Sequence, residues 1–397
     1  MSLFNDKIKC GLEGRKHSLE IVKSKISPND KVIWMHSASL GEYEQGVPVL
    51  EKLKEKYPDY KILITFFSPS GYENVAKKQT IADAVCYLPF DKKSQIKEFV
   101  SNFKTDIFFT VKYDYWYHLL DELKSQGAKI YVISALFYKN QVFFKPYGKW
   151  IINQLKKNVD WFFHQTKNSE ELAKKARLVH SSVSGDTRFD RVRQNLVRDN
   201  FVEYIEEFKQ NKTTIIFGSS WEAEERIAEI LAHKHPEIKI IIAPHDLKRV
   251  PHLQELFPKS VLYSQFFDPS TPQLLNSSIL IIDSIGLLSK LYSYGNLAVV
   301  GGGFHSAGLH NILESAVFGI PVFFGNRYRK NPEADSLIEA KGGKSFEDEY
   351  FASKYISEIL KNPDIMEAMG ENAKQLILSQ PDSAEMIVEK IVSGLKP

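Results

Sequence analysis

Short apolar segments alternate with longer amphipathic segments along most of the chain. In the first half, the apolar segments are VIWM, KILITFF, AVCYL, DIFFTV, KIYVISALF, VDWFFHQT and SSVSG. A strand that is covered by helices on both sides is apolar at consecutive positions, because both of its faces are buried. The alternation of such strands with helix-length segments therefore predicts a doubly wound parallel sheet.

The same pattern lapses and then starts again in the second half. A charged, helix-like stretch, RVRQNLVRDNFVEYIEEFKQNK, is followed by the apolar segments TTIIFGSS, KIIIAPH, SVLYS, LLNSSILIIDS, LAVVGGG and PVFFG. We therefore expect two α/β domains, residues 1–190 and 212–375, joined by a linker over 191–211. Residues 376–397 are expected to form a helix that packs back on the first domain.

Length and composition agree with two domains that each bury a core. The chain has 397 residues, of which 43% are hydrophobic and 25% charged, values that are ordinary for a soluble globular protein. A formal charge of +3 does not indicate nucleic-acid binding. Cys10 and Cys86 lie far apart in the sequence, and neither has metal-ligand or CxxC spacing, which favours a reducing compartment. No segment has the roughly 20 apolar residues of a membrane span, and the N-terminus lacks a signal-peptide core.

Glu42 stands between a strand-like segment and a helix-like segment, in HSASLGEYEQG (36–46). A glutamate near the start of a helix can cap it, because its carboxylate accepts backbone N–H groups and favours the positive helix end. A carboxylate at the end of a buried strand can equally serve catalysis. These residues alone leave both interpretations open. Asp114, bracketed by aromatic residues in VKYDYWYHLL (111–120), is a second carboxylate at a strand end.

The block VVGGGFHSAGLHNILESAVFGIPVFFG (299–325) is the strongest ligand-binding signal in the second half. It predicts a strand, a glycine turn and then a helix that begins near Asn311 and carries Glu314. Glycines let a backbone approach a ligand closely, and free amides at a helix start attract a phosphate or a carboxylate. A tight glycine turn with ordinary capping by Asn311 explains the block equally well. His305 and His310 lack a further ligand cluster, so no metal site is expected.

Three further turns follow apolar strands in the second half. The turns in IIAPHDLKR (241–249) and DSIG (283–286) are suited to holding a base or a ribose, and GSSWEAEE (218–225) is interpreted as helix capping. In the first half, LFYKNQVFFKPYGKWIINQLKKN (136–158) interleaves lysines with aromatic residues. Such a segment either contacts an amphipathic acceptor and anionic lipid headgroups or is a partly buried helix with solvated lysines.

Taken together, these blocks resemble the Kdo transferases, glycosyltransferases that move 3-deoxy-D-manno-octulosonic acid (Kdo) from CMP-Kdo to a lipid A precursor. The resemblance runs from about Val32 to about Gly343. It rests on HSASLGE (36–42), TFFSPSGYE (65–73), SGDTRFD (184–190), GSSWEAEE (218–225), APH (243–245), DSIG (283–286) and GGGFHSAGLHNILESAVFGIPVFFG (301–325). It implies the GT-B architecture, in which two Rossmann-like domains face each other across a cleft, the first for the acceptor and the second for CMP-Kdo.

The resemblance also implies an activity and a set of site residues. The activity is an inverting transfer of Kdo to a lipid A precursor, lipid IVA, in lipopolysaccharide biosynthesis, with release of CMP and without a cofactor. The glutamate of the first block is the family's general base and falls on Glu42, and Asp114 is a candidate for the acceptor site. The nucleotide contacts fall on Pro244, His245, Ser284, Ile285, Gly286, Asn311, Ile312, Leu313 and Glu314.

The chain departs from the family pattern at several positions. Many members have an arginine at the position of His245 and a glutamate at the position of Leu287. The family's block Glu-Thr-Glu-Leu-Trp-Pro corresponds to Lys112–Tyr117 here, and of its two acidic positions only Asp114 keeps a carboxylate. Members also begin with an apolar membrane anchor, whereas this chain begins MSLFNDKIKC. We therefore expect a chain shortened at its N-terminus, from an enzyme of the cytoplasmic face of the inner membrane.

Two other classes of function remain open at this stage. One is another nucleotide-sugar transferase or a UDP-sugar epimerase, because these enzymes share the fold and a phosphate-binding turn. The other is a non-catalytic nucleotide-binding protein at a membrane, which would tolerate the loss of Glu42.

Overall fold

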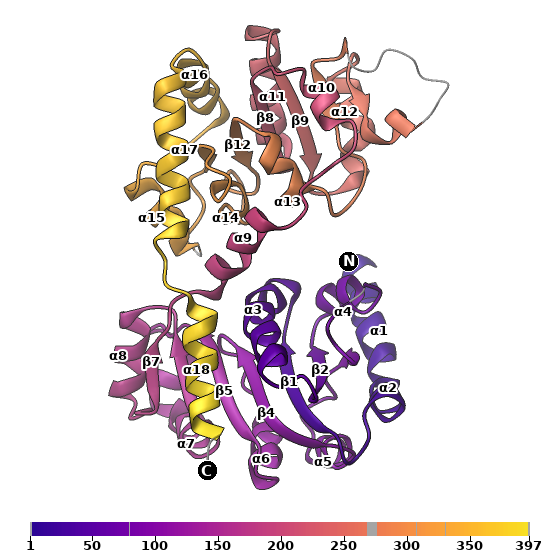
Figure 1. Cartoon of the computed structure of the whole chain (residues 1–397), viewed down its shortest axis with the longest axis vertical. Coiled ribbons are helices and arrows are strands. Elements are labelled where there is room, and N and C mark those ends of the chain that lie inside the picture. Colours follow the sequence, from indigo (N-terminus) through magenta and orange to yellow (C-terminus); the bar gives the residue numbers. More distant parts are fainter. Residues whose placement is uncertain (1, 79, 268–275, 307, 330, 396–397) are drawn as a thin grey trace. The chain divides into compact units, whose positions relative to one another are not determined.

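The protein divides into two compact units, each built around one parallel sheet (Figure 1). The computed structural model describes residues 2–78, 80–267, 276–306, 308–329 and 331–395. Unit 1 comprises Met1–Arg191 and Pro381–Pro397, and unit 2 comprises Val192–Gln380. Residues 192–211, which we expected to be a linker, belong to unit 2, and the chain returns to unit 1 at residue 381.

Unit 1 contains seven parallel strands in the order β3-β2-β1-β4-β5-β6-β7. The strands are β1 (Lys31–Ser37), β2 (Lys61–Phe66), β3 (Ala84–Tyr87), β4 (Lys104–Val111), β5 (Lys129–Ala135), β6 (Trp161–His164) and β7 (Ser181–Val183). The helices are α1 (Ser2–Lys16), α2 (Ser18–Lys25), α3 (Leu40–Lys56), α4 (Pro69–Val75), α5 (Lys93–Val100), α6 (Tyr117–Ser125), α7 (Lys149–Asn158), α8 (Lys167–Lys175) and α18 (Ser383–Leu395), with α9 (Thr187–Val197) at the boundary.

The first strand shows why the apolar segments form a sheet that is buried on both faces. Val32 and Trp34 point into a core that also contains side chains of α5 and α6, while Ile33 and Met35 point into the core beneath α3 and α18. All four side chains are fully buried. Trp34 packs against Phe108 with ring centroids 5.3 Å apart. Successive strand residues alternate between faces, so a continuous apolar segment serves two cores at once.

The last helix, α18, completes unit 1 although it follows unit 2 in the sequence. Ala384, Ile387, Val388 and Ile391 are fully buried in the same core as α3 and the strands. Lys52 of α3 donates to Glu385 of α18 at 2.6 Å. The C-terminal segment therefore covers one face of the first sheet (Figure 1).

Unit 2 contains a second sheet of seven parallel strands, in the order β10-β11-β9-β8-β12-β13-β14. The strands are β8 (Thr214–Ser220), β9 (Lys239–Pro244), β10 (Val261–Leu262), β11 (Ile279–Ile281), β12 (Leu297–Val300), β13 (Val322–Gly325) and β14 (Gly343–Phe346). The helices are α10 (Ile205–Lys209), α11 (Glu222–Lys234), α12 (Val250–Leu256), α13 (Leu288–Leu291), α14 (Leu313–Ala316), α15 (Pro332–Glu339), α16 (Glu349–Leu360) and α17 (Pro363–Leu378).

The predicted fold class, α/β with two doubly wound Rossmann-like sheets, is confirmed. Two details differ from the sequence analysis. The strand β14 was not predicted, because GKSF is neither apolar nor alternating. The expected helix after Asn311 is reduced to the four residues of α14, because the backbone leaves the helix and turns at Gly319, where φ is +76°.

Candidate active site

Each sheet has one point where the strand order reverses, and ligands of doubly wound proteins bind beyond the carboxyl ends of the strands at this point. In unit 1 the reversal lies between β1 and β4, and in unit 2 between β8 and β12. Glu42 follows β1 and Asp114 follows β4. The two carboxylates singled out in the first half of the sequence thus lie at the reversal of the first sheet.

Glu42 is both a helix cap and a partly buried carboxylate. It occupies the third position of α3, and its Oε2 accepts from Ser39 N at 2.9 Å and from Ser39 Oγ at 3.1 Å, as part of a capping box. Its Oε1 accepts no hydrogen bond from any residue that the structure describes. One carboxylate oxygen therefore holds the helix start, while the other is available for chemistry.

Burial and a neighbouring charge both increase the basicity of this carboxylate. Burial raises the pKa of Glu42, the negative charge of Asp114 raises it further, and Lys112 and the bonds from Ser39 act in the opposite direction. Lys112 has a left-handed backbone with φ of +64°, a conformation that costs a non-glycine residue free energy and is common at functional sites. It lies at the end of β4, where the chain turns toward Asp114.

A chain of buried side chains holds Asp114 in place. Its Oδ2 lies 2.7 Å from Nε2 of His36, which is fully buried at the end of β1. With the proton on Nε2, His36 donates to Asp114, and its Nδ1, 2.9 Å from Thr65 Oγ1, accepts from that hydroxyl. Trp34 Nε1 donates in turn to Thr65 Oγ1 at 2.8 Å. The hydrogen-bonded side chains come from β1, from β2 and from the turn after β4, so the sheet helps to fix the position of the carboxylate.

Trp116 connects the same chain to a nearby aromatic surface. Its Nε1 lies 3.1 Å from His36 Nε2. This ring nitrogen can hydrogen-bond to only one partner at a time, and its shorter contact with the Asp114 carboxylate is the stronger of the two. The Trp116 ring stacks on Phe67 with centroids 4.9 Å apart. The Arg15 guanidinium lies over Phe67 at 4.7 Å and donates to its carbonyl oxygen. Helix α1 is thereby attached to the carboxyl edge of the sheet.

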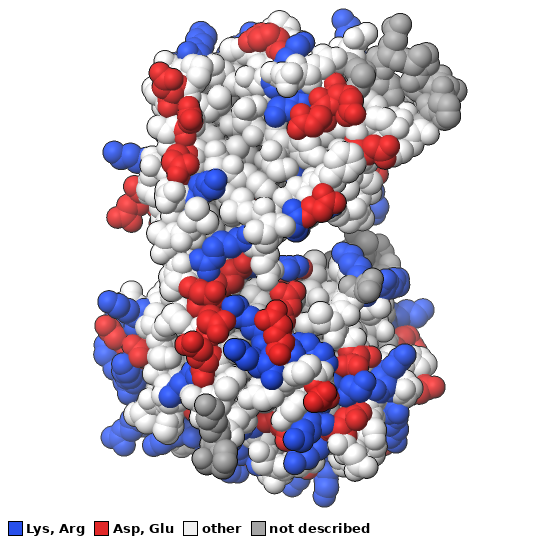
Figure 2. All heavy atoms as spheres, viewed as in Figure 1, with Lys and Arg blue, Asp and Glu red and all other residues white. Residues whose placement is uncertain are grey.

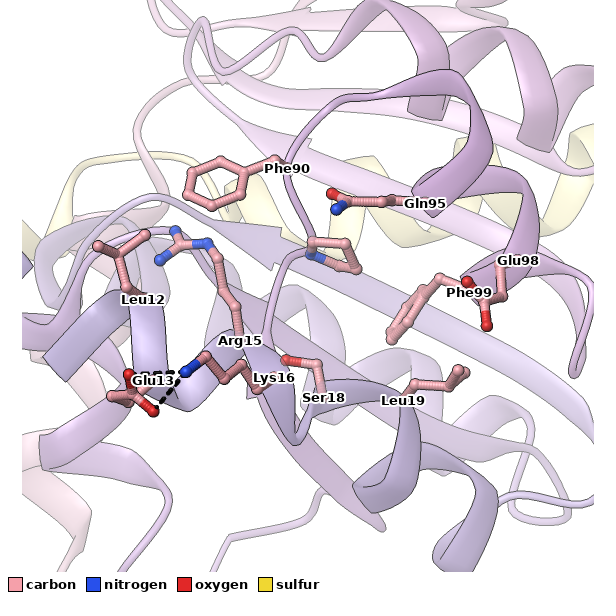
Figure 3. Close-up of a pocket in the computed structure, with 11 residues that line it drawn as sticks. Leu12, Glu13, Arg15, Lys16, Ser18, Leu19, Phe90, Gln95, Glu98 and Phe99 are labelled. Atoms are coloured by element: carbon pink, nitrogen blue, oxygen red, sulfur yellow. Dashed lines mark hydrogen bonds and ion pairs between the residues drawn. The ribbon is translucent and has the colours of Figure 1, made fainter. Parts of the chain in front are cut away.

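A pocket of about 610 Å³ lies beside this attachment. In Figure 3, Arg15 extends from α1 toward Phe90, while Lys16 is paired with Glu13 at a distance of 2.8 Å. Leu12 and Phe90 remain 44% and 38% exposed. The pocket thus offers an apolar lining with a charged rim.

The basic and aromatic segment 136–158 includes the partly buried helix α7, whose Leu155 lies in the core, and other side chains of the segment face solvent. Tyr147 is 71% exposed and Trp150 is 54% exposed. A pocket of about 770 Å³ is lined by apolar and cationic side chains of this segment, of α8 and of the two residues after α8: Lys139, Phe143, Phe144, Lys145, Lys149, Ile152, Asn153, Leu172, Lys175, Ala176 and Arg177. Figure 2 shows many Lys and Arg side chains over this part of unit 1.

In unit 2, the two turns expected to flank a base do meet in one place. A pocket of about 390 Å³ is lined by the ends of β9 and β11 and the start of α13: Ala243, Pro244, His245, Asp246, Leu247, Ile282, Ser284, Ile285, Gly286 and Leu288. This volume is within the range of small-molecule sites. Five of the predicted nucleotide-binding residues therefore share one pocket.

The other four predicted contacts, residues 311–314, do not line that pocket. Ile312 and Leu313 are fully buried, so only their backbone groups can meet a ligand. Asn311 Oδ1 already accepts from Leu313 N at 3.1 Å, and Asn311 Nδ2 donates to Glu314 at 3.0 Å. The first amide of α14 is therefore capped, as in the structural alternative that the sequence left open.

The glycine turn before it is explained by internal packing. A Cβ on Gly301 would lie 2.0 Å from Ser219 O, and a Cβ on Gly303 would lie 2.6 Å from Gly325 N. Gly302 N donates to Glu224 at 3.1 Å. Other backbone segments therefore fill the space beside the Cα atoms of these glycines, and their contact with a ligand stays a prediction.

Glu224, which the sequence analysis treated as a simple cap, is a buried structural carboxylate. It is fully buried, and its two oxygens accept from Trp221 N at 2.9 Å and from Gly302 N. Burial raises the pKa of Glu224 to about 7. The residue thus connects the turn after β8 to the turn after β12.

Four aromatic rings gather at the reversal of the second sheet. Trp221 stacks on His245 with ring centroids 4.5 Å apart, and His305 approaches Trp221 edge-on at 4.4 Å. His310 lies 4.6 Å from His245. Only His245 was predicted as a contact, because nothing in the spacing of Trp221, His305 and His310 shows that their loops meet.

Within the described residues, the protein has neither a metal-binding cluster nor a membrane-spanning helix. No group of three or more His, Cys, Asp or Glu side chains there has the arrangement of a metal site. No helix in the same part of the chain is long and apolar enough to cross a membrane.

Two Rossmann-like units, each built on a doubly wound parallel sheet, have the fold of the GT-B class. A solved structure, UDP-GlcNAc 2-epimerase from Neisseria meningitidis bound to UDP-GlcNAc, aligns with a TM-score of 0.64 over 91% of this chain and all of its own. The identity is 16%, so the likeness concerns the fold.

Sequence comparisons indicate the family within this class. The model of the family described as 3-deoxy-D-manno-octulosonic-acid transferase (kdotransferase) matches residues 13–191. The 3-deoxy-D-manno-octulosonic acid transferase of Chlamydia trachomatis serovar D is 25% identical over 387 residues, which cover 94% of this chain and 88% of the relative. The transferase of the same name from Aquifex aeolicus is 25% identical and covers 78% and 80%. Residues 13–191 thus match the Kdo transferase family, and most of the chain is similar to Kdo transferases, which are glycosyltransferases.

Proposed function

We propose that the protein transfers Kdo from CMP-Kdo to a lipid A precursor, lipid IVA, with inversion at the anomeric carbon and release of CMP. The similarity of the chain to Kdo transferases supports this donor and this acceptor class. The observation that carries the mechanism is Glu42 at the strand-order reversal of unit 1, a carboxylate whose pKa is raised and whose Oε1 has no hydrogen-bond partner in the described part of the chain.

In the proposed step, the acceptor hydroxyl oxygen attacks the anomeric carbon of Kdo. The bond between that carbon and the phosphate oxygen breaks, and CMP leaves with the electron pair. Glu42 Oε1 accepts the hydroxyl proton as the new glycosidic bond forms. A base with a raised pKa is better suited to this transfer than an exposed carboxylate.

Asp114 has an electrostatic role in this mechanism. Its negative charge increases the basicity of Glu42, and the bond from His36 holds it at the carboxyl edge of β4. It can also accept a hydrogen bond from a hydroxyl of the acceptor sugar, because its side chain is 20% exposed. His36 is then a positioning residue that acts through Asp114.

Unit 2 holds the nucleotide in this proposal. The pocket beside His245 and Ser284 takes the base and ribose of CMP, and the backbone of residues 311–314 lies near its phosphate. Leu313 N is capped by Asn311, so the phosphate bonds to other amides of this turn.

The acceptor reaches unit 1 from a membrane surface in this proposal, at the cytoplasmic face of the inner membrane. The apolar pocket beside Arg15 suits acyl chains, and the exposed aromatic and lysine side chains of 136–158 suit an anionic lipid surface. The contact is peripheral for the part of the chain that the structure describes.

The direct test is to measure CMP release from CMP-Kdo in the presence of a tetraacylated lipid A precursor. Matched reactions contain UDP-N-acetylglucosamine or another nucleotide sugar in place of CMP-Kdo. Turnover that requires both CMP-Kdo and the lipid supports the proposal. Turnover with a UDP-sugar alone would instead indicate an epimerase or another transferase of the same fold.

A further inference from the structure

The ring cluster of unit 2, defined as Trp221, His245, His305 and His310, has polar atoms that the proposed function does not use. Its members follow three strands, β8, β9 and β12, at the strand-order reversal. Trp221 Nε1 and His310 Nε2 are buried and have no hydrogen-bond partner among the described residues. Buried polar groups without partners are rare in folded proteins and require an explanation.

The chemistry of these atoms restricts the ligand that can satisfy them. An indole N–H can only donate a hydrogen bond, so its partner must be an acceptor. An imidazole donates from one nitrogen when neutral and from both when protonated. His245 also lines the pocket proposed for the nucleoside, so the cluster adjoins that pocket.

We propose that the ring cluster is an anion subsite, which takes a negatively charged oxygen group of the donor, either the phosphate or the sugar carboxylate. This proposal rests on the proposed function and specifies how unit 2 recognises the charged part of its donor. Both unpartnered nitrogens are buried in the free cluster, so binding of the anion requires a shift of the rings. Trp221 Nε1 and His310 Nε2 then donate to the bound oxygens.

Proton uptake is expected to accompany binding. Burial lowers the pKa of His245, of His305 and, to about 4, of His310, so the free cluster carries little charge at neutral pH. The charged groups that act on the three imidazoles are Asp246 and Glu222, which favour protonation, and Arg327, which opposes it. Glu224 accepts hydrogen bonds from the backbone amides of Trp221 and Gly302. A bound anion favours the imidazolium form, so at least one histidine gains a proton.

The test is calorimetry on the full chain with CMP, cytidine and free Kdo, in two buffers of different ionisation enthalpy. We expect proton uptake with CMP or Kdo and none with cytidine, which has no anionic group. Trp221→Phe keeps an aromatic ring and removes the donor, and should weaken anion binding about tenfold without changing cytidine binding. His310→Phe should act in the same direction. Trp161→Phe is the control, because Trp161 donates to Ser182 in unit 1.

The outcomes separate this subsite from the proposed function. Weaker CMP binding in Trp221→Phe assigns the phosphate to the cluster, and weaker Kdo binding assigns the carboxylate. CMP and Kdo binding that are unchanged in both variants, with no proton uptake, would overturn the subsite and leave the proposed donor intact. A protein that binds neither CMP nor Kdo would overturn both. Melting temperatures within a few degrees of the parent exclude misfolding as the cause.

Discussion

At the scale of single residues, the candidate site of unit 1 depends on two carboxylates, Glu42 and Asp114, that have different roles. Glu42 uses one oxygen to cap α3, and its other oxygen has no hydrogen-bond partner among the residues that the structure describes. Asp114 is held by a buried histidine and faces Glu42 closely enough to affect its ionisation. A residue that caps a helix is thus compatible with catalysis, and the two interpretations of Glu42 from the sequence are not exclusive.

The first prediction concerns the pH dependence of turnover. Glu42 must be unprotonated to accept a proton, so the rate rises as pH passes through its pKa. Asp114 raises that pKa and Lys112 lowers it. Asp114→Asn should therefore move the acidic limb of kcat/KM to lower pH, and Lys112→Gln should move it to higher pH. Rate profiles against pH for both variants and for Asp59→Asn, an exposed control on unit 1, check this. Shifts of the same sign in both variants would contradict the assignment.

The sequence predicted the carboxylates but not what surrounds them. Glu42 was predicted because it lies in a short contiguous motif, HSASLGE (36–42). His36 and Asp114 are 78 residues apart, and their contact depends on the adjacency of β1 and β4, which no local pattern specifies. The left-handed backbone of Lys112 could not be predicted from the sequence either, because lysine, unlike glycine or asparagine, does not favour that conformation.

At the scale of elements, the C-terminal helix α18 packs against the sheet that the N-terminal half of the sequence forms. Its apolar side follows the helical period and fits the face of the first sheet beside α3. The helix was predicted from this period. The strand β14 was not, because an edge strand with Gly343 and Lys344 lacks an apolar pattern.

The second prediction concerns the contribution of α18 to unit 1. Ile391 is fully buried, whereas Met386 is 45% exposed. Ile391→Ala should lower the free energy of unfolding of unit 1 by about 2–5 kcal/mol, because it leaves a cavity in the core, and Met386→Ala should lower it by less than about 1 kcal/mol. Urea unfolding followed by tryptophan fluorescence measures both. Equal effects of the two variants would mean that α18 does not stabilise the sheet.

The third prediction concerns the basic surface of α7 and the segment before it. Replacing Lys139, Lys145 and Lys149 together by Glu should abolish most co-sedimentation with anionic vesicles, because each lysine contributes on the order of 1 kcal/mol there. Binding of the parent should fall as salt rises. The matched control reverses three lysines of unit 2, Lys234, Lys354 and Lys361. If both triple variants sediment like the parent, the surface is solvated and has no membrane role.

At the scale of the whole molecule, the two units have separate tasks in the proposed reaction. Unit 1 carries the base and the apolar and cationic surfaces suited to a lipid acceptor, and unit 2 carries the nucleotide pocket. The division between units was visible in the restart of the strand pattern. The boundary itself was not predicted correctly. Residues 192–211 are not a linker, because they contain the helix α10, whose Ile205 and Phe208 are fully buried in unit 2.

The fourth prediction is that CMP binds the full chain through unit 2. Asn311→Ala should weaken CMP binding about tenfold, because Asn311 fixes both Leu313 N and Glu314 at the turn proposed for the phosphate. Calorimetry with CMP and UMP measures affinity and base selectivity, and Asn362→Ala, in the turn before α17, is the control. Equal affinities for CMP and UMP would remove selectivity for cytosine, and an unaffected Asn311→Ala would remove this turn from the site.

The central claim is that Glu42 is the base of a Kdo transfer, and Glu42→Gln tests it most directly. Glutamine can keep the bond from Ser39 N and therefore the capping box, but its amide cannot accept the proton. The measurement is CMP release from CMP-Kdo with a tetraacylated lipid A precursor, alongside CMP affinity, melting temperature and the control Glu55→Gln on the same helix. We predict a loss of turnover of about 10²-fold or more, with affinity and melting temperature nearly unchanged. A stable Glu42→Gln enzyme with the turnover of the parent would contradict the account and leave Glu42 as a helix cap alone.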